Sequence, residues 1–243
     1  MALGTWVAIE ADGPAAAIDG AFAAIAAVEE RLHPSREGSD LQRLRDSPSG
    51  ARVGVHPMTF RVLSFARRLF ALSGGVFDPC LPGRPGRLGD LELGYGATGA
   101  PWACCSRPLE IDCGGVAKGY AIDRAVEALQ GADCTAGLVN AGGDLRVFGR
   151  ARRTILVRRA DGRCEPVELG GGAIAVSDRD SSRAPRGHRG YYRRGAPASP
   201  ARRFAAVHAA DAMTADGLTK CVLLCDPEQA RAIVRALGGR LLG

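Results

Sequence analysis

The most informative stretch of the 243-residue sequence is Asp112-Cys113-Gly114-Gly115-Val116-Ala117-Lys118-Gly119-Tyr120. Apolar residues over 109–112 predict a short strand, the glycine pair predicts a sharp turn, and apolar positions over 116–129 recur at helical spacing. Backbone amides at a helix N-terminus favour anions such as phosphates. The stretch lacks the Walker pattern and the Gly-x-Gly-x-x-Gly dinucleotide fingerprint. Its residues alone therefore leave a phosphate site and a plain capped helix about equally open.

Downstream of this stretch the pattern becomes strand-like. Strands are expected over 136–140 and 144–149, and Ala141-Gly142-Gly143 joins them as a β-hairpin. Such a glycine turn would let a flat ligand approach the backbone closely, although the residues alone favour an ordinary hairpin turn. Further strands are expected over 154–158, 173–177 and 204–209.

A second polar cluster lies near the C-terminus, in Ala215-Asp216-Gly217-Leu218-Thr219-Lys220. We expect Thr214 to cap a helix that runs to about Leu224, which makes Asp216, Thr219 and Lys220 neighbours by the i, i+3, i+4 rule. Asp216 and Thr219 carry hard oxygen ligands suited to Mg²⁺. The residues alone favour the simpler interpretation, a carboxylate that stabilises the helix dipole and pairs loosely with Lys220.

The N-terminal third of the chain reads as alternating helices and loops. Apolar spacing predicts a strand over 3–10, a helix over 14–32 and a helix from about Pro57 to 72 that stops at Gly74-Gly75. Ser39-Asp40-Leu41 falls in an expected loop. Residues 82–108 are rich in Gly and Pro and predict a long loop with at most one helical turn, placed where it could cover a site.

Composition excludes several classes of protein. The net charge is +6, but fourteen arginines lie between Arg150 and Arg203 without the interleaved aromatic residues of a single-strand platform, so we expect a solvated face and no nucleic acid partner. Eight cysteines lack zinc-site spacing and are expected to be free structural thiols.

With no apolar run long enough for a membrane helix and no secretory signal, the sequence predicts a cytoplasmic protein with one domain over 1–243.

Lysine usage is unusual, because only Lys118 and Lys220 are lysines among 32 basic residues. A lysine ammonium is compact and rotatable, and it suits a tight site in which a planar guanidinium does not fit. Codon bias explains the same count equally well. The two lysines nevertheless mark both of the polar clusters described above.

Taken in order, these segments resemble the ApbE family, the FAD:protein FMN transferases. Asp112 through Asp123 is similar to the family's central Asp-Leu-Gly-Gly-Ile-Ala-Lys-Gly-Tyr-Ala-Val-Asp almost residue for residue. The other similar segments are Leu3-Gly4-Thr5, Ser39 to Leu44, Gly74-Gly75-Val76-Phe77-Asp78-Pro79, Gly137 to Arg146, and Ala215 to Leu218. The resemblance spans most of the chain and implies an α+β fold, with an antiparallel sheet and flanking helices around a groove for FAD.

The resemblance also implies a reaction and a set of site residues. FMN would pass from FAD, as substrate, to a threonine or serine hydroxyl of a flavin-acceptor protein, with Mg²⁺ on the pyrophosphate and AMP as the leaving group. Lys118 and Asp216 would be the catalytic residues. The flavin nucleotide would lie near Val76, Phe77, Asp78, Asp112 and Lys118, and Mg²⁺ near the Gly115 carbonyl, the Asp216 carboxylate and Thr219.

This sequence departs from the family pattern at two places that bear on activity. The family's His-Ile-Ile-Asp-Pro-x-Thr-Gly segment is missing between Ser177 and Phe204, and Lys220 stands where the family has a threonine four residues after the metal aspartate. We therefore expect weakened Mg²⁺ binding. The alternative function is a catalytically impaired ApbE-like protein that binds FAD without transferring FMN.

Overall fold

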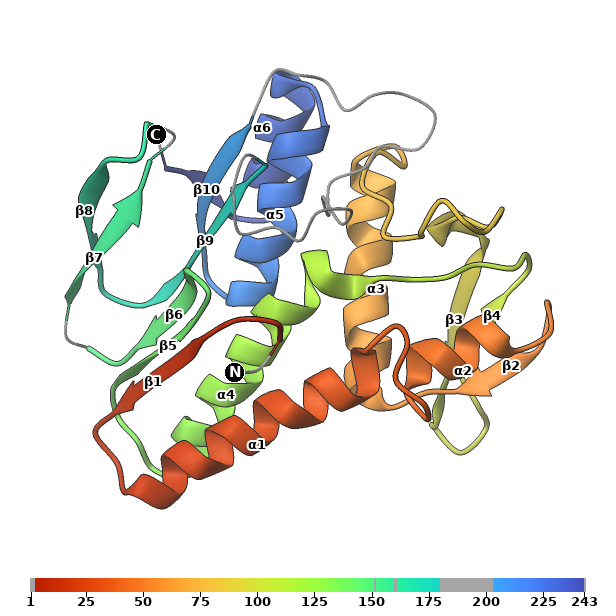
Figure 1. The fold of residues 1–243 in the computed structure, drawn as a ribbon, viewed down its shortest axis with the longest axis horizontal. Helices are drawn as coiled ribbons and strands as arrows, with labels where there is room; N and C mark the ends of the chain where they lie inside the picture. Colours follow the sequence, from red (N-terminus) through yellow and green to blue (C-terminus); the bar gives the residue numbers. More distant parts are fainter. Residues whose placement is uncertain (1–2, 151, 160, 180–202, 243) are drawn as a thin grey trace.

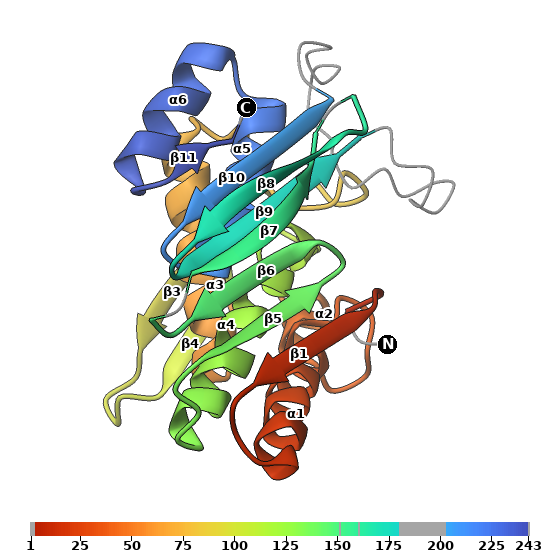
Figure 2. The ribbon, with the colours of Figure 1, turned by 90° about the vertical axis from the view of Figure 1, so that its left-hand side faces the viewer.

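The computed structural model describes residues 3–150, 152–159, 161–179 and 203–242. Its centre is an antiparallel sheet of six strands (Figures 1 and 2). In spatial order the strands are β1 (Val7–Ala11), β5 (Gly137–Ala141), β6 (Asp144–Phe148), β9 (Gly172–Asp178), β10 (Phe204–Ala209) and β11 (Arg240–Leu241). The fold is therefore α+β with an antiparallel sheet, as the sequence predicts.

Three helices cover one face of this sheet: α1 (Ala15–Leu32), α4 (Ala117–Gly131) and α5 (Ala212–Leu224) (Figure 2). Helix α1 buries Ala17, Ala21, Ile25, Val28 and Leu32, whose spacing of three and four residues forms one stripe. Successive strand residues point to opposite faces, so in β9 Ala173 and Ala175 lie in the helix-side core while Ile174 lies in the core of the other face.

A hairpin of β7 (Arg153–Arg158) and β8 (Cys164–Leu169) packs on the opposite face. Val157 and Leu169 of this hairpin share a small core with Leu145, Val147 and Ile174 of the main sheet. The sequence predicts the first strand of the hairpin and misses the second. In β8, Pro166 and the charged neighbours of Val167 hide the alternation that identifies a strand.

A second small sheet, in the order β2 (Arg52–Gly54), β4 (Pro101–Cys105) and β3 (Leu91–Tyr95), lies beside α2 (Asp40–Asp46) and α3 (Pro57–Leu72). The expected loop over 82–108 is therefore wrong in part, because β3 and β4 lie within it. The one helical turn allowed for in that loop is present as the 3-10 turn Leu88–Asp90. The expected loop at Ser39 to Leu41 is also wrong, because Ser39 caps α2 by accepting a hydrogen bond from the Gln42 N–H.

Two further expectations need correction. Residues 109–112 form no extended strand, and Ile111 makes only an isolated bridge to Cys80. Helix α5 begins at Ala212 and is capped by Asp211, whose side chain accepts from the Thr214 N–H, so Thr214 is not the cap. The last helix, α6 (Pro227–Ala236), is capped by Asp226, with Pro227 in its first turn.

The structure gives no disulfide for any of the eight cysteines, and all except Cys164 are buried. No helix in the described ranges combines the length and apolar character that crossing a membrane requires. Part of the arginine-rich segment, residues 180–202, lies outside the described residues, as does most of the stretch in which the family's histidine motif is missing.

Candidate functional site

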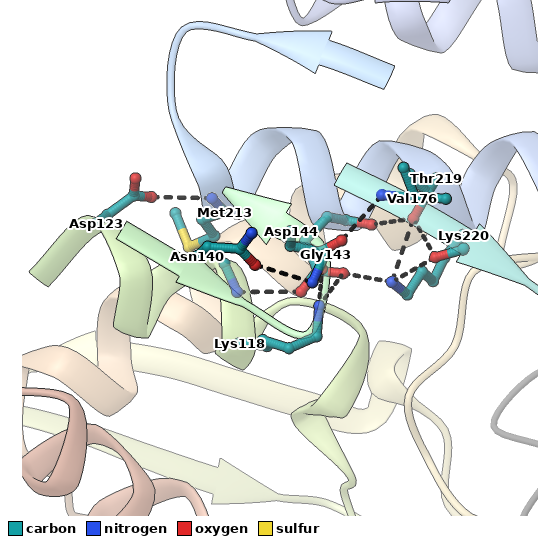
Figure 3. A network of polar contacts seen from close by, with 12 residues as sticks. Lys118, Asp123, Asn140, Gly143, Asp144, Val176, Met213, Thr219 and Lys220 are labelled. Atoms are coloured by element: carbon teal, nitrogen blue, oxygen red, sulfur yellow. Dashed lines mark hydrogen bonds and ion pairs between the residues drawn. The ribbon is translucent and has the colours of Figure 1, made fainter. Parts of the chain in front are cut away.

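The two lysines of the chain meet where α4, the β5–β6 hairpin and α5 come together. Figure 3 shows Lys118, Asp144, Thr219 and Lys220 converging from these elements, with Val176 of β9 beside them. Lys118 stands in the first turn of α4, and Lys220 lies one turn after Asp216 on α5. Two segments about a hundred residues apart in sequence thus form one polar cluster.

Lys118 is positioned by the turn that precedes α4. The Asp112 side chain accepts a hydrogen bond from the Gly114 N–H at 2.8 Å and caps a 3-10 turn over Cys113–Gly115. This turn leads directly into α4, so Lys118 leaves the first helical turn toward the sheet. Asp112 itself is exposed, and its observed role is that of a cap.

The partner of Lys118 is Asp144, at the start of β6. Gly142 and Gly143 have φ values of +64° and +101°, as a two-residue type I′ hairpin requires. The turn sets Asp144 inward, where it is 1% exposed. One carboxylate oxygen accepts from the Val176 N–H at 2.9 Å, and the other forms an ion pair with the Lys118 ammonium.

Asp216 is the fully buried centre of the cluster. Its Oδ2 accepts from the Gly119 N–H at 3.1 Å, and its Oδ1 accepts from the Lys220 ammonium. The Lys118 ammonium lies 3.9 Å from the same Oδ1. One carboxylate therefore faces both lysines of the chain.

The Lys220 ammonium has a second pair of acceptors in the hydroxyls of Ser177 on β9 and Thr219 on α5, at 3.0 and 3.2 Å. The Thr219 hydroxyl donates to the Asp216 main-chain oxygen at 2.7 Å, so Ser177 is the donor in the 2.7 Å contact between the two hydroxyls. The two lone pairs of Thr219 Oγ1 are thus directed at Ser177 and Lys220.

These contacts test whether the expected residues fit Mg²⁺. A magnesium ion needs oxygen lone pairs at near-ideal octahedral positions. The Thr219 hydroxyl has none free, and Asp216 Oδ1 faces two ammonium groups. A Cβ placed on Gly115 would lie 3.3 Å from Lys220 Cγ, so the lysine stem covers the glycine expected to contribute its carbonyl. The expected set of Gly115, Asp216 and Thr219 does not fit the metal in this arrangement.

Burial separates the two lysines. The Lys118 side chain is 25% exposed and that of Lys220 is 11% exposed, so Lys118 is the outer cation and Lys220 the inner one. Burial lowers the pKa of Lys118 to about 8, the Asp216 carboxylate opposes this, and the Lys220 ammonium adds to it. Lys118 is the more exposed of the two cations, and its ammonium is paired with Asp144.

Asp123 holds the helices of the site together. Its carboxylate accepts from the Ala212 and Met213 N–H groups at the start of α5, at 2.8 and 2.9 Å, and from Arg146 on β6 at 2.8 Å. Burial raises the pKa of Asp123 to about 6, against the effect of these hydrogen bonds. Figure 3 shows Asp123 and Met213 at the edge of the lysine cluster.

The residues expected near the flavin do not all lie at the lysine cluster. A Cβ on Gly115 would lie 3.8 Å from Phe77 Cε2, which brings buried Phe77, Gly115 and Lys220 together. The Asp78 carboxylate holds its own loop, by accepting from the Cys80 and Leu88 N–H groups and from Arg87. Val76 is half-buried on the same segment.

Sequence reasoning missed three residues of the cluster, Asp144, Ser177 and Asp123. Asp144 is quoted in the hairpin motif, yet nothing local indicates that it pairs with Lys118. Ser177 lies near the end of β9 and meets Lys220 through the packing of α5 on β9. Among the described residues, no group of three or more His, Cys, Asp or Glu side chains gathers as a metal site.

Comparisons with known proteins identify the family to which a chain with this fold and this cluster belongs. The sequence profile of the ApbE family matches residues 3–83 and 92–241, so the chain belongs to the ApbE family. No curated protein matches the chain. Many solved structures do match it.

Three of these structures illustrate the likeness. The ApbE protein of Thermotoga maritima is 23% identical with a TM-score of 0.78, over 100% of this chain and 91% of that one. The flavin transferase ApbE of Vibrio cholerae is 20% identical with a TM-score of 0.80, over 100% and 90%. The flavinyl transferase ApbE of Pseudomonas stutzeri is 19% identical with a TM-score of 0.80, over 99% and 90%. At these identities the likeness shows the fold.

Proposed function

We propose that this chain transfers the FMN part of FAD to a serine or threonine hydroxyl of a flavin-acceptor protein and releases AMP. Membership of the ApbE family supports this proposal, as do the flavin transferase activities named for the Vibrio cholerae and Pseudomonas stutzeri neighbours. In such a reaction the acceptor oxygen bonds to the FMN-side phosphorus, the bond from that phosphorus to the bridging oxygen breaks, and AMP leaves with the bridging oxygen.

The proposal is supported most by Lys118 at the start of α4, the more exposed of two lysines that share one buried cluster of carboxylates. Phosphoryl transfer needs positioning and neutralisation of the charge that spreads over the phosphate oxygens. Lys118 would neutralise this charge, and Phe77, beside Gly115, would pack on the nucleotide. Val76, Asp78 and Asp112 would shape the same rim, Asp112 through the turn that it caps.

Mg²⁺ dependence is the part of the sequence prediction that fits this structure least. Two of the three residues expected to hold Mg²⁺, Asp216 and Thr219, already accept hydrogen bonds from the Lys220 ammonium. In place of the metal, the residues of this chain bind the phosphates, fix Asp216 between two ammonium groups and exclude water from the inner part of the cluster.

A second candidate function is FAD binding without FMN transfer. One observation favours it: Asp216, expected to be catalytic, is fully buried and already paired with Lys220. Both functions require a flavin dinucleotide at the same cluster. They differ only in whether AMP is released.

Incubation with FAD and a flavin-acceptor protein distinguishes these functions. The proposed transferase yields AMP and a fluorescent acceptor band in equal amounts, whereas the binding function retains FAD with neither product.

We expect Lys118→Met to weaken FAD binding by at least about tenfold, the effect of losing a charge-assisted contact. Arg124→Met is the matched control, because it removes an exposed cation from the same helix. Equal losses of FAD affinity in the two variants would show that Lys118 does not bind FAD.

A further inference from the structure

The inner lysine has all of its hydrogen-bonding capacity satisfied by the site. An ammonium has three donors. Those of Lys220 match three acceptors: Asp216 Oδ1, the Ser177 hydroxyl and the Thr219 hydroxyl. The side chain is 11% exposed, so little water competes for these acceptors. Lys220 is therefore a fixed cation inside the cluster.

The charges of the cluster balance without any added ion. Two carboxylates, Asp144 and Asp216, face two ammonium groups, Lys118 and Lys220. Asp216 is the more deeply buried carboxylate of the pair, and a buried carboxylate requires a partner of opposite charge. Lys220 is that partner. A divalent cation entering beside Asp216 would meet the Lys220 ammonium, and at about 4 Å this repulsion offsets a large part of the pull of the carboxylate.

Residue choice supports the same interpretation. Elsewhere in the chain every lysine or arginine except Lys118 is an arginine, whose planar fork is wider than the compact ammonium of lysine. The Lys220 stem packs against Gly115, with 3.3 Å between its Cγ and the position of a glycine Cβ. The slim stem and compact head of lysine match the room that these neighbours leave.

We propose that the Lys220 ammonium takes the place of a divalent cation as the partner of Asp216, so that this chain binds the phosphates of its flavin nucleotide through Lys118 without a divalent metal. The claim that Lys118 binds the phosphates of the flavin nucleotide rests on the proposed function. The claim that Lys220 replaces a divalent cation does not. Lys220 is a positioning residue here, because it acts through Asp216 and leaves the outer ammonium to meet the ligand.

Metal binding by the flavin-free protein tests the cation part, with Mn²⁺ as the probe and electron paramagnetic resonance as the readout. We expect no specific Mn²⁺ binding by the wild type and binding at least about a hundredfold tighter by Lys220→Thr, which removes the ammonium and adds an oxygen ligand. Adding Asp216→Asn to Lys220→Thr should abolish the new site. Wild-type binding that equals that of Lys220→Thr overturns the proposal, and so does absence of binding by both proteins.

A measurement without any variant guards against a Lys220→Thr protein that fails to fold. A ligand that binds only the folded state raises its melting temperature. We expect the wild-type melting temperature to be the same in EDTA and in about 10 mM Mg²⁺, whereas a rise of about 2 °C or more would show a metal site and overturn the proposal.

FAD binding in EDTA and in Mg²⁺ then tests the nucleotide part. Equal affinity in the two buffers is expected. Lys220→Met, which leaves Asp216 as an unpaired anion near the phosphates, should weaken FAD binding by at least about tenfold even in EDTA. Binding that requires Mg²⁺ overturns the inference. Absence of FAD binding in both buffers overturns the proposed function instead, while the Mn²⁺ result still decides whether Lys220 replaces the cation.

Discussion

Each of the two lysines is held by a carboxylate that has almost no contact with water, so at the scale of single residues the site depends on charge pairing. Removing one member of a buried ion pair leaves the other uncompensated, at a cost of about 3 to 5 kcal/mol. We expect Asp216→Asn to lower the free energy of unfolding by about 3 kcal/mol. Urea unfolding followed by circular dichroism measures it.

A double-mutant cycle separates pairing from packing at this position. Lys220→Met keeps the length of the side chain and removes its charge, so combined with Asp216→Asn it should restore at least about 1 kcal/mol relative to the sum of the single variants. Additive losses would mean that the two groups do not interact. The control is Asp19→Asn on the exposed face of α1, which should change stability by less than about 0.5 kcal/mol.

A second residue-scale prediction concerns Asp40, which is 1% exposed at the start of α2. Burial alone would raise the pKa of Asp40, but hydrogen bonds from Thr59, the His56 N–H and Arg43 outweigh it and hold the pKa below its ordinary 3.8. Such a carboxylate stabilises the fold above pH 3.8, and this contribution is lost as the pH falls through the lower, folded-state value.

We therefore expect Asp40→Asn to destabilise the protein by about 2 kcal/mol at neutral pH and by progressively less in acid. Unfolding free energies measured at pH 7 and near pH 3 provide the comparison. A difference between wild type and variant that stays constant over this range would show that Asp40 contributes packing alone.

At the scale of elements, the site depends on how closely α4 crosses α5. A Cβ placed on Gly119 would lie 2.2 Å from the Ala212 main-chain oxygen, which is backbone and cannot move aside. We expect Gly119→Ala to destabilise the protein by about 2 to 3 kcal/mol and to separate Asp216 from the Gly119 N–H. Thermal unfolding measures this loss.

Gly131, in the last turn of the same helix, provides the control for Gly119. Nothing lies within 4 Å of a Cβ at Gly131. Alanine there should be neutral or should stabilise by up to about 1 kcal/mol, because alanine is the better helix former. Similar losses in both variants would point to helix propensity rather than to the crossing of α4 and α5.

Elements with strong periodicity could be predicted from the sequence, and those built from glycine and proline could not. Helices over 14–32 and 116–129 were foreseen because their apolar stripes are long. Strands β3 and β4 were missed because Gly94 and Pro101 indicate a loop. In the structure Gly94 pairs with Trp102, and a Cβ on Gly94 would lie 2.4 Å from the indole, so the glycine makes room for the ring across the strand.

The same limit applies to the site. Lys118, Asp216 and Lys220 were identified from motifs, and the Lys220–Asp216 contact follows from helical spacing alone. The contacts of Lys118 with Asp144 and of Lys220 with Ser177 depend on how the hairpin and β9 pack against α4 and α5. No local pattern encodes such packing, and this is why Mg²⁺ ligands were expected where hydrogen bonds to an ammonium are found.

In the whole molecule, the sheet and its helices bring two distant motifs to one cluster, in which Lys118 is the more exposed lysine. We propose that this cluster binds the phosphates of a flavin dinucleotide. A crystal structure of the protein with FAD, grown in EDTA, decides the question. We expect pyrophosphate oxygens within about 3.5 Å of the Lys118 ammonium, with the Lys220 ammonium still on Asp216. FAD bound with its pyrophosphate away from Lys118, or Lys220 displaced from Asp216, would contradict it.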